Sequence, residues 1–256
     1  MANIKIPDIA KYDAMKTIVD NTSNLKFSQT SAAQVKDIPE EYSLRDKFSE
    51  PYDQGATKCS STCAAIGCED YYDFGPKSKW VPSLAFTYYN QHIVDKAEKP
   101  YGSGSSCVES ALFAVNEYGV CDAKSYPNDS DFTKKPAKAL YTKSLKGHQS
   151  SKYYNISSIT QIKQAISAGY PVPFSMDWYN SFKLLSKNIL SDPAEDDVYT
   201  HENGHSMIIV GYDDKKELVE VRNSWGPNWG DKGYCYIKYS TLIRTIWWDD
   251  TFAVIK

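Results

Sequence analysis

The sequence predicts an α+β fold in which a helical half precedes a β-rich half. Few glycines and prolines interrupt residues 60–74 and 108–118, and Gly119 directly follows the second of these segments, as at many helix ends. From Pro171 onward, short apolar segments alternate with turn residues, which is typical of strands. With 256 residues and 41% hydrophobic content, the chain can bury a sizeable core in one domain of two lobes.

Each predicted element depends on a local pattern. In the first predicted helix, residues 60–74, the one glycine is Gly67, which weakens the prediction slightly because glycine is a poor helix former. In the second half, β-branched and aromatic residues mark the strands, and Asp or Gly marks the turns between them. Strands are expected at residues 208–210, 218–221 and 234–239, with turns at residues 213–214 and 231–233.

Residues 1–37 differ in pattern from residues 38–256. Asp8 can cap a helix that ends near residue 21 and carries one apolar side, formed by Ile9, Tyr12, Met15, Ile18 and Val19. A polar connector, residues 28–36, follows. We therefore treat residues 1–37 as a segment separate from the main domain, with an ordinary N-terminal helix packed on the core as the alternative.

Charge and hydropathy disfavour two classes of partner. The net charge of −3 at pH 7 gives no reason to expect nucleic acid or an anionic membrane as a partner. No segment reaches membrane-spanning length. The first seven residues also lack the apolar run of a signal peptide.

Three short motifs supply groups for nucleophilic catalysis. Gly204-His205 opens a predicted strand, and Asn223-Ser224-Trp225-Gly226 begins 18 residues after His205. Upstream, Gln54-Gly55 stands six residues before Ser60, which opens a predicted helix. An imidazole can serve as a base, and an amide oxygen can fix its tautomer without adding a charge. One such motif alone is a plausible turn or strand histidine, but the three together, in order, favour an active site.

These motifs resemble those of the papain-like cysteine peptidases, over roughly Ile38 to the C-terminus. In that family a Cys lies six residues after the Gln, and the His and Asn follow at distances like those in this sequence. The resemblance implies a two-lobed fold, with a helical left lobe, an antiparallel β-barrel-like right lobe and an active-site cleft between them. It also implies an endopeptidase that cleaves peptide bonds through a thioester acyl-enzyme and needs no cofactor and no metal.

The resemblance assigns a role to each catalytic motif. Residue 60 would be the nucleophile, His205 its acid and base, and Asn223 the acceptor for the far ring nitrogen. Gln54 would donate to the oxyanion together with the backbone N–H of residue 60, where the helix dipole also favours negative charge. Each role of the family's site therefore has a candidate in this sequence.

Three further residues are candidates for substrate binding. The resemblance implies that Trp225 covers the hydrogen bond between the histidine and the asparagine and floors the primed side of the cleft. It also implies that Gly104 and Ser105, in a loop of small residues, pair through their backbone with an extended substrate. A plain turn has the same sequence signature as this loop.

Ser60 stands where the family has its cysteine, and three interpretations remain open. In the first, cysteine is native and the serine is a deliberate change that prevents self-cleavage, so the chain is inactive because a hydroxyl has a far higher pKa than a thiol. In the second, serine is native, and the protein is a pseudo-peptidase that binds peptides or a weak serine-type enzyme. In the third, Cys59 is the nucleophile and the loop is one residue shorter than the family's.

The resemblance also bears on partners and location. Residues 1–37 would be a short pro-segment whose helix docks on the main domain and whose connector crosses the cleft as an inhibitor, beside a peptide or protein substrate as the second partner. Thr57 stands where secreted relatives place a bridging cysteine. With six cysteines and no partner at that position, an intracellular or virion-associated protein is favoured over a secreted one.

Overall fold

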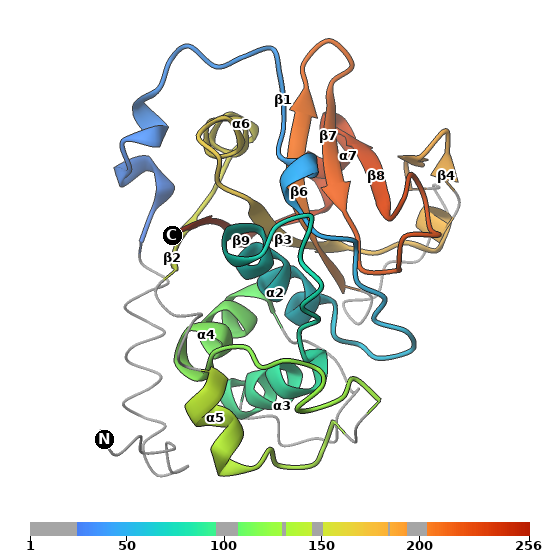
Figure 1. Ribbon diagram of the computed structural model, residues 1–256. Coiled ribbons are helices and arrows are strands. Elements are labelled where there is room, and N and C mark those ends of the chain that lie inside the picture. Colours follow the sequence, from blue (N-terminus) through green and yellow to red (C-terminus); the bar gives the residue numbers. More distant parts are fainter. Residues whose placement is uncertain (1–24, 96–106, 130–131, 145–150, 184, 194–203) are drawn as a thin grey trace.

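The computed structural model describes residues 25–95, 107–129, 132–144, 151–183, 185–193 and 204–256. Figure 1 shows a group of helices below and a sheet above, with α2 running between them, so the predicted α+β, two-lobed class is confirmed. The predicted N-terminal helix and the loop with Gly104 and Ser105 lie outside the described residues. The α-helices are α2 (Ser60–Asp73), α3 (Leu84–Val94), α4 (Val108–Tyr118), α5 (Lys138–Ser144), α6 (Ile159–Ser167) and α7 (Tyr239–Thr245).

In the described residues, nine strands form one sheet with the order β2-β9-β3-β6-β7-β8-β5-β4, and β1 pairs with β6 beside this path. The pairs are antiparallel except for β5 and β8. All three predicted strands are present, and β9 continues the sheet after α7. The strands are β1 (Glu41–Ser43), β2 (Lys152–Asn155), β3 (Val172–Asp177), β4 (Leu185–Ser186), β5 (Ile189–Leu190), β6 (Gly204–Asp213), β7 (Leu218–Arg222), β8 (Tyr234–Lys238) and β9 (Ile246–Ile255).

Helix α2 lies against the sheet, and Gly67 makes the close approach possible. A Cβ atom at Gly67 would stand 2.6 Å from Ile208 Cδ1 and 3.0 Å from Arg222 Nη1, closer than packed atoms tolerate. The glycine therefore does not interrupt the helix, which continues to Asp73 as predicted. It leaves room for the ends of the Ile208 and Arg222 side chains, which come from strands β6 and β7.

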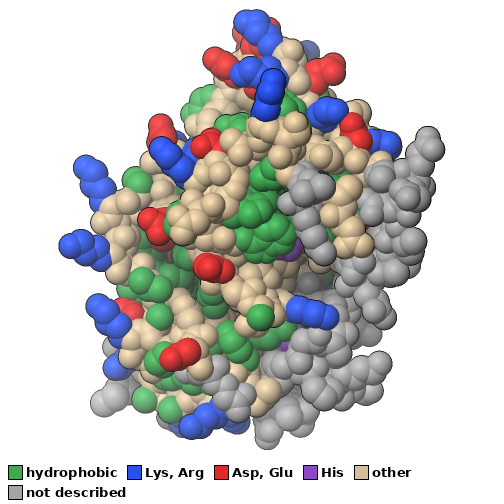
Figure 2. All heavy atoms as spheres, turned by 90° about the vertical axis from the view of Figure 1, so that its right-hand side faces the viewer, with side chains coloured by type: hydrophobic (Ala, Val, Ile, Leu, Met, Phe, Trp, Pro, Cys, Tyr) green, Lys and Arg blue, Asp and Glu red, His purple; other side chains and the backbone are tan. Residues whose placement is uncertain are grey.

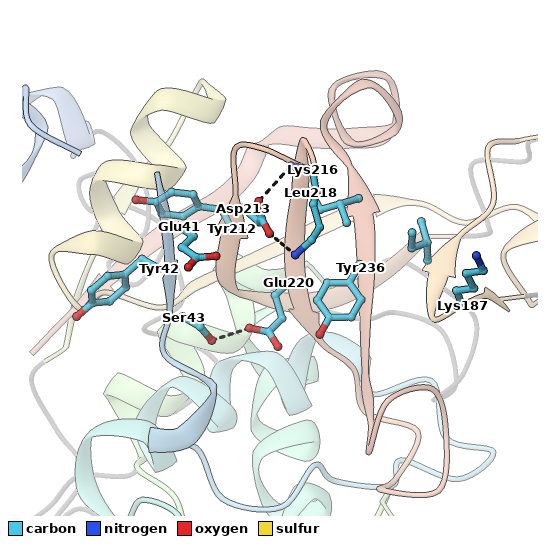
Figure 3. A pocket seen from close by; sticks show the side chains of 11 residues that line it. Glu41, Tyr42, Ser43, Lys187, Tyr212, Asp213, Lys216, Leu218, Glu220 and Tyr236 are labelled. Carbon is cyan, nitrogen blue, oxygen red and sulfur yellow. Dashed lines mark hydrogen bonds and ion pairs between the residues drawn. The ribbon is translucent and has the colours of Figure 1, made fainter. Parts of the chain in front are cut away.

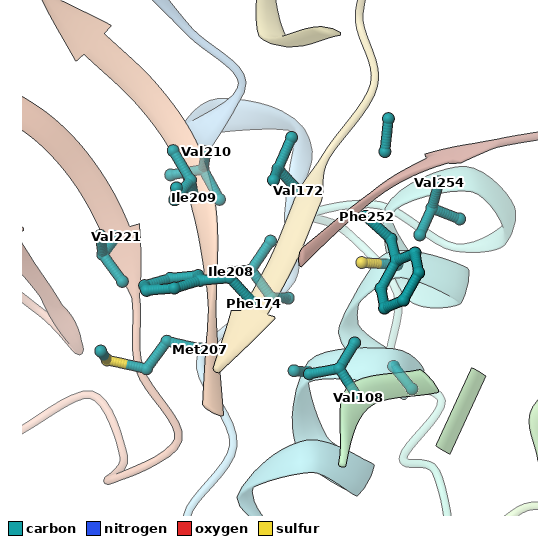
Figure 4. Packing of buried hydrophobic residues seen from close by; sticks show 14 of the residues in the cluster. Val108, Val172, Phe174, Met207, Ile208, Ile209, Val210, Val221, Phe252 and Val254 are labelled. Carbon is teal, nitrogen blue, oxygen red and sulfur yellow. The ribbon is translucent and has the colours of Figure 1, made fainter. Parts of the chain in front are cut away.

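One large hydrophobic core joins α2 to the sheet. Figure 4 shows part of it, with Phe174 from β3, Ile208 from β6 and Phe252 from β9 among the closely packed side chains. Each of these three side chains is at most 1% exposed. Burying a side chain of this size contributes about 1.5–3 kcal/mol to folding. The core thus holds the two strands that carry the predicted catalytic motifs against the helix.

The described part of the N-terminal segment packs on α6. Phe27 is 0% exposed, and Gln164 Nε2 of α6 donates to the backbone oxygens of Ala33 and Val35 over 2.8 and 3.0 Å. Figure 1 shows this blue segment beside α6. The expectation that the connector crosses the active-site cleft is therefore wrong, because its backbone oxygens are bound by a helix of the β-rich lobe.

All six cysteines are free thiols. Within the described ranges, no helix combines the length and the apolar character needed to cross a membrane.

Candidate active site

His205 and Asn223 meet where β6 begins and β7 ends. His205 is the second residue of β6, and Asn223 directly follows the last residue of β7. Because the two strands are antiparallel neighbours, these ends lie side by side. His205 Nε2 lies 2.7 Å from Asn223 Oδ1, and both residues are buried. The predicted pair is therefore in direct contact.

The contacts of Asn223 define the tautomer of His205. The backbone N–H of Ser224 also donates to Asn223 Oδ1, over 2.8 Å. An amide oxygen only accepts hydrogen bonds, so His205 Nε2 must carry a proton. In the neutral ring the lone pair then lies on Nδ1, and that nitrogen is available to take a proton from a nucleophile.

Position 60 lies at the N-terminus of α2, as predicted. Ser60 is the first residue of the helix and is partly exposed, whereas the residues after it are buried. The backbone N–H of Ser206 donates to Ser60 Oγ over 3.2 Å, so position 60 lies beside the residue that follows His205. The helix N-terminus favours negative charge, which suits an anionic nucleophile at this position.

Cys59 has different surroundings from Ser60. It is 0% exposed, and its Sγ lies 3.9 Å from Sγ of Cys63, which is also buried. The hydrogen bond with Cys59, together with burial, raises the pKa of the Cys63 thiol well above its ordinary value. Cys59 thus faces the interior of the protein, where a substrate carbonyl does not reach it.

Gln54 is held beside the asparagine turn. Its backbone N–H donates to the oxygen of Ser224 over 2.9 Å, and Ser224 Oγ donates to Gln54 Oε1 over 2.5 Å. Gln54 Nε2 donates to the backbone oxygen of Thr57 over 2.7 Å, within the loop that leads to α2. An amide nitrogen has two N–H groups, so one of them remains available for an oxyanion. The structure thus joins Gln54 to the Asn223–Ser224 segment.

Tryptophan rings surround His205. The ring centroid of Trp225 lies 5.1 Å from that of His205, and the centroid of Trp178 lies 4.7 Å from it. Trp178 and Trp225 touch edge to face, and Trp229 packs in the same way on Trp225. The rings help to keep water from the hydrogen bond between His205 and Asn223.

Trp178 was not expected from the sequence. It follows β3 directly, and β3 pairs with β6 so that Met176 lies opposite His205. Its place beside the imidazole therefore depends on strand register, which no motif around Trp178 signals. A tryptophan just after an apolar strand was the only signal available.

Gly204 has a packing role beside His205. A Cβ atom there would lie 2.6 Å from the ring of Trp247, whose Nε1 donates to Asp177 Oδ1 over 2.6 Å. The glycine of the Gly-His motif thus leaves room for an indole from β9. Trp247 belongs to the C-terminal segment, so this segment packs directly next to the site.

Hydrophobic side chains gather in the middle of this side of the molecule. Figure 2 shows them next to small areas of histidine, with Lys, Arg, Asp and Glu side chains above them, along the left and below.

A separate cavity of about 670 Å³ lies on the β-rich lobe, between β1 and the β4–β5 hairpin. Figure 3 shows Asp213 next to Lys216 and Glu220 next to Ser43, with Lys187 apart from them. Asp213 pairs with Lys216, and Glu220 accepts from Ser43 and from Arg45, which lies outside the cavity lining. None of the predicted catalytic residues lines this cavity.

Burial lowers the pKa of His205 to about 4, although the hydrogen bond with Asn223 acts in the opposite direction. With a neutral serine at position 60, the imidazole is therefore neutral at pH 7. A thiolate at position 60 would favour the imidazolium, because an opposite charge at close range stabilises the charged form.

Over the residues that the structure describes, no group of three or more His, Cys, Asp or Glu side chains could hold a metal ion.

A family model described as "Papain family cysteine protease" matches residues 38–245. The chain belongs to this family. The match begins where the sequence indicates the start of the main domain, and it includes all four predicted catalytic positions.

Curated relatives agree with this assignment. An uncharacterized peptidase C1-like protein of Acanthamoeba polyphaga mimivirus is 29% identical over 177 residues, which cover 64% of this chain and 55% of the relative. Cathepsin S of Bos taurus is 28% identical over 153 residues, covering 56% of this chain and 44% of the cathepsin. The chain thus spans about half the length of the curated relatives it matches.

Solved structures show the same fold. Xylellain, a cysteine protease from Xylella fastidiosa, matches with a TM-score of 0.72 at 24% identity, covering 88% of both chains. Digestive procathepsin L 3 of Tenebrio molitor matches with a TM-score of 0.64 at 16% identity, covering 93% of this chain and 77% of the other. The helical lobe and the antiparallel sheet are therefore those of the papain fold.

The lowered pKa of His205 predicts a pH-dependent stability. The imidazole titrates near pH 6.5 in the unfolded chain and near pH 4 in the folded one. Between these values the unfolded chain binds more protons, so stability falls as the pH is lowered through this range. From pH 7 to pH 4.5, His205 should reduce the free energy of unfolding by about 2–3 kcal/mol.

Urea denaturation of the chain and of His205→Gln at both pH values measures this contribution. The variant corrects for the carboxylates that titrate in the same range. Between pH 7 and pH 4.5, the free energy of unfolding should fall by about 2–3 kcal/mol more in the chain with His205 than in the variant. Equal losses in the two proteins would show that the pKa of His205 is not lowered.

Proposed function

We propose that the protein is a papain-like cysteine endopeptidase in which Ser60 stands in place of the nucleophilic cysteine, so that the chain as given is inactive. Its substrate is a peptide or a protein. The observation that carries this proposal is the 2.7 Å contact between His205 Nε2 and Asn223 Oδ1, beside a residue that opens a helix. Family membership supports peptide hydrolysis as the reaction class.

The geometry supports a two-step hydrolysis once a thiol stands at position 60. The thiolate attacks the scissile carbonyl carbon, and the carbonyl electron pair moves to the oxygen. The backbone N–H at position 60 and the free N–H of Gln54 donate to this oxyanion. His205 gives its Nδ1 proton to the leaving amine, and a thioester remains. Water, deprotonated by His205, then attacks the thioester, and the acid and the thiol are released.

A serine at position 60 cannot start this sequence efficiently. A hydroxyl has a far higher pKa than a thiol, and a thiolate rather than a neutral group forms the ion pair with the imidazolium. Asn223 adds no negative charge that would stabilise an imidazolium, and burial of His205 disfavours the imidazolium further. The neutral His205 is therefore a weak base for a hydroxyl.

Two observations favour position 60 over Cys59 as the nucleophile. Ser60 Oγ accepts the N–H of Ser206 next to the catalytic histidine, whereas Cys59 is fully buried and contacts Cys63. A pseudo-peptidase that binds peptides in the same cleft is the second candidate, favoured by the serine itself.

The Ser60→Cys variant should hydrolyse peptides under reducing conditions. Turnover of a fluorogenic dipeptide or tripeptide substrate should appear in this variant and remain at background in the chain as given. A second change, His205→Ala, in the same variant should reduce kcat/KM by roughly 10²–10⁴-fold, because proton transfer by a positioned side chain contributes about that much.

The matched comparison is Cys59→Ala in the Ser60→Cys background. This double variant should keep its turnover. Loss of turnover in a folded protein would indicate that Cys59 is the nucleophile. A folded Ser60→Cys variant without turnover on any substrate, also after removal of residues 1–24, would favour the pseudo-peptidase.

We also propose that the N-terminal segment is an inhibitory pro-segment and that its inhibitory part lies within residues 1–24. Proforms stand among the solved structures with this fold, including the procathepsin of Tenebrio molitor and the ragweed allergen Amb a 11. Residues 25–37 pack on α6 and bury Phe27, so they act as an anchor for what precedes them.

Deleting residues 1–24 from the Ser60→Cys variant should raise its turnover of a small substrate. Deleting residues 1–37 should in addition lower the melting temperature, because it removes the buried side chain of Phe27 from the core. Substrate turnover and thermal unfolding of both deletions separate release of inhibition from loss of packing. Unchanged turnover after the shorter deletion would contradict an inhibitory role.

A further inference from the structure

Asp250 is a buried carboxylate outside the predicted catalytic groups. It is 6% exposed and lies in β9, at an irregularity where Phe174 pairs with Thr251 but Ser175 pairs with Trp247. The two carboxylate oxygens accept the backbone N–H groups of Val108 and Glu109, over 2.9 and 3.0 Å, at the N-terminus of α4. Asp250 therefore caps a helix of the other lobe.

The same carboxylate accepts a third hydrogen bond. Ser175 Oγ of β3 donates to Asp250 Oδ2 over 2.5 Å, and Ser175 is 2% exposed. Burial raises the pKa of Asp250 to about 6, and the charge of Asp249 acts in the same direction. Cys107 also lies nearby, and burial raises the pKa of its thiol to about 12, so it is neutral. Three donors thus point at the two oxygens of Asp250, the arrangement of an ionised carboxylate, which can only accept.

This ionisation state defines the direction of the next hydrogen bond. Ser175 Oγ and Ser206 Oγ lie 2.9 Å apart on the paired strands β3 and β6. A hydroxyl has one proton, and Ser175 gives its proton to Asp250. Ser206 must therefore donate to Ser175, which ties the side chain of Ser206 to the carboxylate.

Ser206 also contacts the nucleophile position. Its backbone N–H donates to Ser60 Oγ over 3.2 Å, and it directly follows His205. A continuous set of hydrogen bonds thus runs from the N-terminus of α4 to the N-terminus of α2. We call Asp250, Ser175 and Ser206 the polar bridge.

We propose that the residues of the polar bridge are positioning residues for the nucleophile: they hold the N–H of Ser206 against position 60. The proposal rests on the proposed function of that position. The N–H donor favours a negative charge on the atom that it contacts, so it would lower the pKa of a thiol there. Removing one residue of this set leaves its buried neighbours without a hydrogen-bond partner. The three residues should therefore act as a unit.

The test uses the Ser60→Cys variant and measures alkylation of the thiol at position 60 by iodoacetamide from pH 5 to pH 9, with the label located by peptide mapping. This profile gives the pKa of that thiol without requiring peptide turnover. Ser175→Ala, Ser206→Ala and the double change are then made in this background. Ser144→Ala is the control, because Ser144 is 1% exposed and donates to Tyr118 in the helical lobe.

The intact variant should show a thiol pKa below the ordinary value of about 8.5. Ser175→Ala should raise this pKa and lower the alkylation rate at pH 6 by roughly three- to tenfold, with a matching loss in kcat and little change in KM. The double change should raise the thiol pKa no more than the larger of the two single changes, because Ser175 and Ser206 belong to the same set of hydrogen bonds. Ser144→Ala should leave the pKa unchanged.

Three results would overturn the proposal, and they have different consequences for the proposed function. If Ser60→Cys is active but Ser175→Ala has the same pH profile as Ser144→Ala, the polar bridge does not position the nucleophile, and the proposed function stands. If Ser60→Cys has an ordinary thiol pKa and no turnover, the positioning role of the polar bridge and the proposed function are both wrong. Additive effects of the two serine changes would also contradict a shared path.

Discussion

The contact between α2 and β6 is the constraint on which the site depends. Gly67 of α2 packs against the ends of the Ile208 and Arg222 side chains from β6 and β7, and Ser60 begins the same helix. Ser60 then lies against Ser206, which is the neighbour of His205. The core of the protein and the catalytic geometry are therefore one packing arrangement rather than two.

The electrostatics of the site follow from burial. His205 and Asn223 are buried, tryptophan rings pack on His205, and this burial disfavours the imidazolium. Opposite them, the start of α2 and the N–H of Ser206 favour a negative charge at position 60. These two preferences are compatible when a thiolate and an imidazolium form together, since each charge then compensates the other. A serine removes the anion, and the histidine stays neutral.

Much of this arrangement can be predicted from the sequence because it is encoded locally. The Gly-His and Asn-Ser-Trp-Gly motifs and the helix of residues 60–74 indicate His205 and Asn223 and place Ser60 at a helix start. The rest depends on pairing between distant residues. Trp178 reaches His205 only through the register of β3 and β6, and Asp250 caps a helix 142 residues away in the sequence. The expected path of the connector is wrong because its partner, Gln164, lies 131 residues from Ala33 in the sequence and shows no local pattern.

The site as described depends on position 60 being the nucleophile position of a papain-type site. Covalent trapping can test this: the Ser60→Cys variant is treated with a peptide carrying an electrophilic epoxide, digested and sequenced by mass spectrometry. We expect one adduct, on the sulfur at position 60, and none when His205 is also changed to alanine. An adduct on Cys59, or labelling that does not depend on His205, would show that position 60 is not the nucleophile position.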